Sequence, residues 1–216
     1  MLHEVTVTGS RHSGEVVRPQ TLRDGYLATL NAHSVADAVR YFAGVQLKDY
    51  GGVGGIKTLD IRSMGTNHMG VFYDGLPVGN AQNGQVDLGR FSLDNIEEIA
   101  LYNGQKSTIF QPARDFASSG SIYIRSRRPR FPSGRNTAGT VVFRTGSFGL
   151  LNPSLRIDRR ISRQVSATFN VEYTYSTGRY RFRYSKYLPD GRIAWDTTAV
   201  RRNGDIRALR AEASVF

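Results

Sequence analysis

The sequence lacks several features that would point to common protein classes. Its 216 residues include no cysteine, which excludes disulfide bonds and thiolate metal ligands. No run of 18 apolar residues could form a membrane-spanning helix. The first residues, Met1, Leu2 and His3, lead directly into polar sequence without the basic and apolar regions of a signal peptide. We expect export to require a leader outside the sequence given.

Motifs for catalysis and cofactor binding are also missing. There is no G-x-S-x-G, no pair of histidines and no dinucleotide fingerprint. The glycine-rich residues 51–55 precede no Gly-Lys-Ser/Thr, so they indicate a turn rather than a phosphate cradle. Adjacent Glu97 and Glu98 would point to opposite faces of a strand, and His68 has no second ligand at metal-binding spacing. We therefore expect no enzyme, no cofactor and no resident metal.

Positive charge is concentrated in the C-terminal part. Residues 131–216 contain 15 Lys and Arg against 6 Asp and Glu, whereas residues 1–130 contain 14 against 12. A basic half can indicate nucleic acid or an anionic surface, and residues 179–187, RYRFRYSKY, could form a stacking patch. Arginine alternating with aromatic residues is also typical of a strand with one wet and one apolar face. We favour that interpretation and expect no nucleic acid partner.

The most organised stretch is residues 58–104. Apolar and polar residues alternate at its start, which predicts a strand, and Asp74-Gly75 predicts a tight hairpin turn. Ser92 is a candidate cap for one helical turn at residues 93–95, and an apolar strand follows over residues 96–102. The pattern indicates a small mixed α/β unit that presents two polar loops.

Two segments of this stretch, LDIRSMGTNHMGVFYDGLPV and VDLGRFSLDNIEEIALYNG, resemble the plug domain of TonB-dependent outer-membrane receptors. The family has Ile-Arg-Gly before a loop, an Asp-Gly-x-Pro turn, and a Leu-x-x-Ile-Glu-x-Ile strand ending in glycine. Ser63 stands where the family usually has glycine. The resemblance implies an α+β plug domain followed by antiparallel strands of a transmembrane β-barrel, about 22 strands in the intact protein.

Three segments follow from this resemblance. Residues 1–10 are a candidate TonB-box segment, residues 11–130 the plug, and residues 131–216 the first three to four barrel strands. The basic, proline-containing residues 125–135 predict the linker. Alternation is unbroken over residues 165–176, which is long enough to cross a bilayer when tilted.

Further strands and a loop are expected on either side of residues 165–176. Alternation predicts neighbouring strands over residues 139–145, 151–158 and 206–216, and residues 188–203 are expected to form an outer loop. The resemblance therefore implies an N-terminal fragment. We expect this fragment alone neither to span a membrane nor to transport, because unpaired backbone groups at an open sheet edge are costly in lipid.

One helix is predicted in the plug. Ser34 is its candidate cap, and Asp37 completes a capping box three residues later. Val35, Val39 and Phe42 share one face, and the helix is expected to end at a glycine. Residues 11–31 are polar and irregular by pattern.

The resemblance implies an importer in the cell outer membrane. Its ligand would be a metal chelate, a corrinoid or a glycan, its energy would come from TonB, and its surroundings would include outer-membrane lipid. A surface lipoprotein is a further candidate partner. The runner-up is a soluble β-rich binding domain with a basic nucleic-acid or lipopolysaccharide-binding face.

Three sets of residues carry these expectations. An extended segment near the start would add as a strand to TonB, with an ordinary first plug strand as the equal alternative: Glu4, Val5, Thr6, Val7 and Thr8. Polar side chains on the two loops would contact ligand, although such residues are also usual in surface loops: Thr66, Asn67, His68, Asn80, Gln82, Asn83 and Gln85. Inward-facing Glu172 would form an ion pair with Arg62 of the plug.

Overall fold

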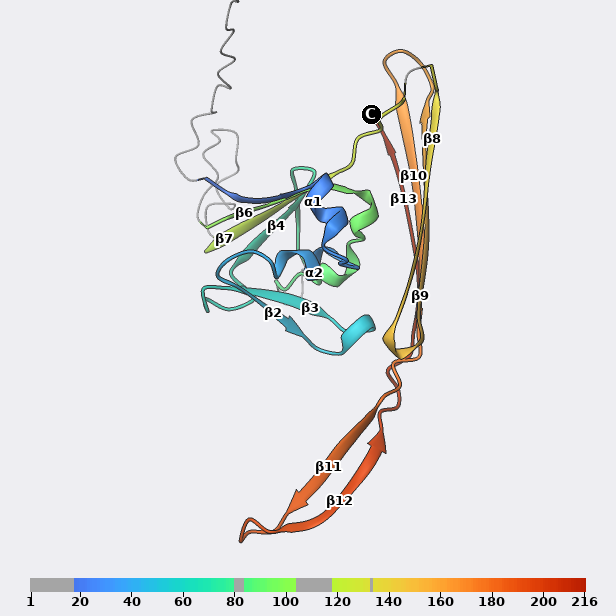
Figure 1. The fold of residues 1–216 in the computed structure, drawn as a ribbon. Helices are drawn as coiled ribbons and strands as arrows, with labels where there is room; N and C mark the ends of the chain where they lie inside the picture. The colour runs from blue at the N-terminus through green and yellow to red at the C-terminus, as the bar shows by residue number, and fades with distance from the viewer. Residues whose placement is uncertain (1–17, 80–83, 104–117, 133) are drawn as a thin grey trace, which may run out of the picture.

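The computed structural model describes residues 18–79, 84–103, 118–132 and 134–216. It has two parts, a plug built of short strands and helices and a tall antiparallel sheet standing beside it (Figure 1). A two-stranded hairpin continues from one end of the tall sheet, away from the end where the chain enters from the plug. No helix in these described ranges is both long and apolar enough to cross a membrane.

The plug is organised around a five-stranded mixed sheet. Its strands lie in the order β1 (Gln20–Arg23), β6 (Ile96–Tyr102), β7 (Gly120–Ser126), β4 (Met69–Tyr73) and β5 (Leu76–Val78). Only β4 and β7 are parallel, and Asp74-Gly75 joins β4 to β5 in a tight turn, as predicted. A separate pair, β2 (Val45–Asp49) and β3 (Lys57–Ile61), lies beside this sheet with the short η1 (Gly52–Gly54) at its end.

Helix α2 (Val35–Val39) packs into the plug core, as the capping pattern predicts. The Ser34 hydroxyl accepts a hydrogen bond from the Asp37 amide at 3.4 Å. Val35 and Val39 are fully buried in a core that includes Leu59 and Leu101. Two single turns, η2 (Leu88–Arg90) and η3 (Leu93–Asn95), follow, and the predicted Ser92 cap of η3 is present.

The prediction of irregular structure over residues 11–31 is wrong for residues 20–29. These form β1 and helix α1 (Asp24–Thr29), which bury Leu22 and Leu27. Each element is too short to show a period, and β1 exists because it pairs antiparallel with the edge of β6.

The tall sheet contains β8 (Thr137–Gly146), β9 (Leu150–Arg160), β10 (Ser166–Ser176) and β13 (Ile206–Val215), in the order β13-β10-β9-β8. The single turn η5 (Ser147–Gly149) joins β8 to β9. Alternate residues of β10 are buried polar groups, including Asn170 and Glu172, while Phe169 and Tyr173 between them are exposed. The polar face therefore lies against the plug and the apolar face points away from it.

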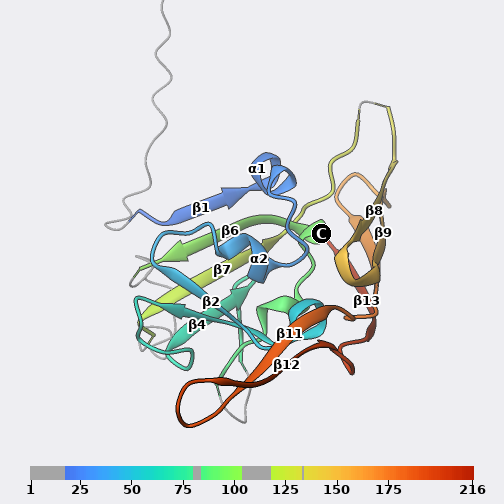
Figure 2. The same cartoon turned by 60° about the horizontal axis from the view of Figure 1, so that its bottom comes forward.

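The hairpin consists of β11 (Arg181–Tyr187) and β12 (Ile193–Val200), and it runs below the plug strands in the view of Figure 2. Arg183 forms an ion pair with Asp196 across it, and the rings of Tyr184 and Trp195 meet edge to face at 5.2 Å. The expectation of an outer loop over residues 188–203 is corrected, because β12 occupies half of that range. Cross-strand pairing with β11 orders it, and such pairing cannot be read from one strand's own pattern.

Ser63 adopts a left-handed backbone, with φ of 59°. A side chain in this region costs about 1 to 2 kcal/mol, whereas glycine does not suffer this penalty. We expect Ser63→Gly to raise the free energy of plug unfolding by about 1 kcal/mol, measured by urea denaturation of the protein. Gln46→Gly, in the exposed part of β2 where φ is not positive, is the matched control and should lower it. Equal effects of the two substitutions would contradict the strain at Ser63.

Candidate functional site

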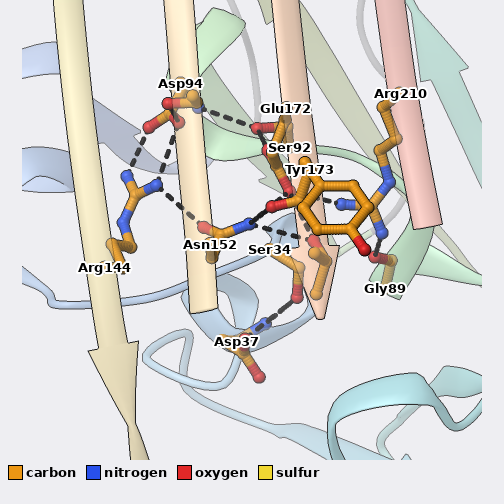
Figure 3. Close-up of polar contacts among 12 residues, drawn as sticks. Ser34, Asp37, Gly89, Ser92, Asp94, Arg144, Asn152, Glu172, Tyr173 and Arg210 are labelled. Carbon is orange, nitrogen blue, oxygen red and sulfur yellow. Dashed lines mark hydrogen bonds and ion pairs between the residues drawn. The ribbon is translucent and has the colours of Figure 1, made fainter. Parts of the chain in front are cut away.

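The plug meets the tall sheet through a polar interface. The segment that carries η2 and η3 lies against the buried polar faces of β9 and β10 and the half-buried face of β13, and Figure 3 shows Ser92 and Asp94 pointing toward these strands. The alternation of β9 and β10 presents polar residues on this face at every second position. Most of the interface bonds join residues more than 50 positions apart in the chain.

Glu172 is the most buried charged group of this interface, with 2% of its surface exposed. Its carboxylate accepts a hydrogen bond from the Ser92 hydroxyl of the plug. Arg210 of β13 forms an ion pair with it at 2.7 Å, and the Asn152 amide of β9 donates to it at 3.1 Å. Arg210 also donates to the plug through the Gly89 carbonyl at 2.9 Å. Glu172 therefore links three strands of the sheet to the plug (Figure 3).

Asp94 forms the second charged contact. It lies in η3, and its carboxylate accepts hydrogen bonds from Arg144 of β8, one of them at 2.9 Å, and from the Ser154 hydroxyl of β9. Burial by itself would raise the pKa of Asp94, but the hydrogen bonds from Arg144 and Ser154 outweigh it and hold the pKa below its ordinary value. Asp94 is therefore ionised at neutral pH and paired.

Asn95 forms a neutral contact between two charged groups of opposite sign. Its amide oxygen accepts from Arg156 of β9 at 2.6 Å, and its amide nitrogen donates to Glu212 of β13 at 2.6 Å. Tyr73 of β4 donates to the same Glu212 at 3.4 Å. Burial, together with the carboxylates of Glu212 and Asp74, raises the pKa of Tyr73, so the phenol remains a donor.

Two hollows lie within the interface. One, of about 330 Å³, is lined by Asp37, Lys57, Glu172 and Arg210 among others. The other, of about 430 Å³, lies between α1 and the strands β8 and β9. Both are large enough and polar enough to hold water. The plug therefore contacts the sheet through paired charges and solvent-sized gaps rather than through an apolar seam.

The structure does not bring Arg62 and Glu172 together. Glu172 faces the plug, as expected, but its charged partner is Arg210 of the neighbouring strand and its plug partner is Ser92. Arg62 is exposed, with a left-handed φ of 52° that turns the chain out of β3. No ion pair joins Arg62 to a carboxylate within the described residues. Ser92, Asp94 and Asn95 make the contacts instead.

The polar loops predicted to contact ligand are partly described. Gln85 donates to the Thr66 hydroxyl at 3.0 Å, which joins the two loops. Asn67 and His68 are exposed and line a hollow of about 390 Å³ with β4, β5 and Ser118. Asn80, Gln82 and Asn83 lie outside the described residues. The candidate TonB segment, Glu4, Val5, Thr6, Val7 and Thr8, lies outside them as well.

The described part of the chain contains no candidate metal-binding site. No group of three or more His, Cys, Asp or Glu side chains there is placed to hold an ion. The carboxylates of the interface are each engaged by arginine, hydroxyl or amide donors. The arrangement is suited to holding the two surfaces together.

The sequence did not predict the interface contacts of η3 and its cap. Ser92 was expected only as a helix cap, and Asp94 and Asn95 only as parts of a helical turn. One signal was available, since residues 92–95 place three polar side chains between two apolar strands. Their partners could not be found from the sequence, because they lie on strands 50 or more residues away.

Comparisons with known proteins agree with this architecture. The profile described as TonB-dependent Receptor Plug Domain matches residues 15–114. Vitamin B12 transporter BtuB of Vibrio vulnificus (strain YJ016) is 24% identical over 162 residues, which cover 75% of this chain and 25% of the transporter. The chain thus spans about a quarter of the length of that relative.

Solved structures share the fold. The pyoverdine outer membrane receptor FpvA of Pseudomonas aeruginosa PAO1 aligns with a TM-score of 0.59 at 13% identity, covering 77% of this chain and 24% of the receptor. The siderophore receptor PirA of Acinetobacter baumannii aligns with a TM-score of 0.55 at 21% identity, covering 74% and 24%. The profile match shows that residues 15–114 are similar to the plug domain of TonB-dependent receptors, and the alignments show that the chain shares the fold of these receptor structures.

Proposed function

We propose that the intact receptor binds a scarce nutrient at the outer surface of its plug and imports it across the outer membrane with energy from TonB. The observation that carries this proposal is the interface between plug and sheet. Its contacts are paired charges and hydrogen bonds around hollows large enough for water. Water can replace such contacts one by one, so the plug can move without exposing a large apolar surface.

The tall sheet suits a barrel wall in the outer membrane. Its face away from the plug exposes apolar side chains, with Val141 at 77%, Leu209 at 71% and Val215 at 73% exposure. A soluble domain rarely presents such a continuous apolar face, so the alternative of a soluble binding domain is not favoured. Closed by the remaining strands of the intact receptor, this face would contact lipid.

The direction of the sheet follows from its connections. Residues 161–165 join β9 to β10 by a short turn, whereas the β11–β12 hairpin joins β10 to β13 at the opposite end. Barrels of this kind have short periplasmic turns and longer extracellular loops. The hairpin end therefore faces outward, and the linker from the plug enters at the periplasmic end.

The domain boundaries are proposed from the same geometry. The last plug strand, β7, ends at Ser126 and the first tall strand, β8, begins at Thr137. These limits support a plug over residues 11–130 and barrel strands over residues 131–216. The candidate TonB-box segment would occupy residues 1–10.

The ligand class is proposed from the family. The relatives are described as transporting vitamin B12, binding siderophores or transporting copper. The loops of this plug present neutral amide and imidazole groups around the 390 Å³ hollow. Such groups suit a large ligand with many oxygen and nitrogen atoms, which includes a metal chelate, a corrinoid or a glycan.

Substitution of the loop side chains tests this site. We expect Asn67→Ala/His68→Ala to weaken ligand binding about tenfold or more, because two hydrogen-bonding groups are removed. The measurement is calorimetric titration of the full-length receptor with cyanocobalamin, a ferric siderophore and a linear glycan, followed by the variant with whichever binds. Asn136→Ala, which removes an exposed amide that does not line this hollow, is the control. An unchanged dissociation constant in the double variant would remove these loops from the ligand site.

A further inference from the structure

We propose that the outward rim of the tall sheet binds the phosphate-bearing headgroup of an outer-leaflet glycolipid. The site is a hollow of about 730 Å³, here called the rim hollow, where β10 and β13 pass into the hairpin. Its lining includes Tyr175, Thr177, Arg179, Arg202, Asp205 and Arg207. The inference rests on the membrane placement given above under the proposed function.

The rim hollow lies on the lipid-facing side of the wall. Tyr175 pairs with Arg207 across β10 and β13, and Ser176 pairs with Ile206 at the next position. Ile206 points toward the plug, since a side chain added at Gly54 of η1 would collide with it. Successive residues of a strand face opposite sides, so Tyr175 and Arg207 face away from the plug. The hollow therefore cannot be part of the lumenal ligand site.

The net charge of the rim hollow is positive. Three guanidinium groups, those of Arg179, Arg202 and Arg207, share it with the single carboxylate of Asp205. Two other acidic residues of the hairpin are already paired, Asp196 with Arg183 and Asp190 with Arg192. Within the described ranges no ion pair engages the three arginines of the hollow. Arginine forks match the geometry of phosphate oxygens, which makes a phosphate group a fitting ligand.

The surface below the rim hollow is suited to acyl chains. On the same face, β10 continues with Tyr173, Val171 and Phe169, and β13 with Leu209 and Ala211. The Arg207 guanidinium lies 5.7 Å from the centre of the Tyr175 ring, which places a cation and an aromatic ring together at the edge of the apolar band. A free anion would use the cations alone, whereas an anionic lipid uses the cations and the apolar face together.

Lipid retention tests the inference. The full-length receptor is reconstituted in phosphatidylcholine nanodiscs with a bisphosphorylated, acylated glucosamine disaccharide, and the lipid retained after detergent extraction is counted by native mass spectrometry. We expect Arg179→Gln/Arg202→Gln/Arg207→Gln to reduce retention about tenfold or more. Arg181→Gln/Lys186→Gln/Arg192→Gln removes the same charge from the hairpin outside the hollow and should retain the lipid.

Several results would overturn the inference. Equal loss in the two triple variants would mean that only overall charge matters. Equal retention of the dephosphorylated lipid would remove the phosphate, and displacement by inorganic phosphate at the same concentration would indicate a site for free anions. If the triple variant does not fold, Arg207→Gln alone decides, since retention equal to wild type would contradict the role of the hollow.

The outcome separates this inference from the proposed function. A receptor that inserts into nanodiscs but retains no glycolipid disproves only the rim hollow. A receptor that does not insert at all disproves the membrane placement and, with it, the inference.

Discussion

Replacing Glu172 with alanine should lower the free energy that holds the plug against the barrel wall by about 3 to 5 kcal/mol, because removing one member of a buried ion pair leaves its partner uncompensated. Arg210 would lose its counter-charge, and Ser92 and Asn152 would each lose an acceptor. The plug and three strands of the tall sheet meet at this carboxylate, which is 2% exposed.

These 216 residues contain no cysteine, so an introduced thiol is the only one in this part of the receptor. A single fluorophore on Tyr50→Cys, an exposed plug position, reports plug release during a urea titration of the full-length receptor. Glu172→Gln should show a smaller loss, since the amide oxygen can still accept from Asn152. Asp190→Ala breaks an ion pair on the exposed hairpin and should leave the release midpoint unchanged. Equal midpoints for wild type and Glu172→Ala would mean that the plug is held elsewhere.

Deleting residues 4–8 should reduce uptake of the ligand to background while its dissociation constant stays the same. The β-branched Val5, Thr6 and Val7 favour an extended chain that can add as a strand to a partner's sheet. We propose that TonB pairs with this segment, so its loss would remove the energy supply and leave the plug loops intact. The measurement is uptake of labelled ligand by cells, with binding measured on the same cells without an energy source.

Two controls distinguish a TonB segment from an ordinary first strand of the plug. Val5→Pro removes a backbone donor and fixes φ, so it should block strand addition, whereas Val5→Ala should preserve it. Deletion of residues 11–15 shortens the chain equally without touching the segment. If the deletion of residues 4–8 also weakens ligand binding or plug stability, the segment belongs to the plug fold instead.

Local rules account for what could be predicted. The Ser34 cap, the Asp74-Gly75 turn and the Ser92 cap each depend on residues within a few positions, and all are present. Period-two alternation assigned the inward face of β10 correctly, including Glu172, because successive side chains of a strand point to opposite faces of the sheet. The missed elements include β1, α1, β2 and β12, none of which has a long period.

The amino-acid sequence by itself indicated a plug domain, the order of the main elements along the chain, and the face on which each strand residue lies, because these follow from spacing along the chain. The tertiary structure alone decided which groups meet. Arg62 and Glu172 have opposite charges, and the sequence predicts an ion pair between them. In the structure Glu172 is bound by Arg210 and Ser92 instead, which lie 38 and 80 residues away in the chain. Alternation determines the face to which a side chain points. It does not determine which position along the strand the plug contacts, because that position depends on the packing of the whole plug.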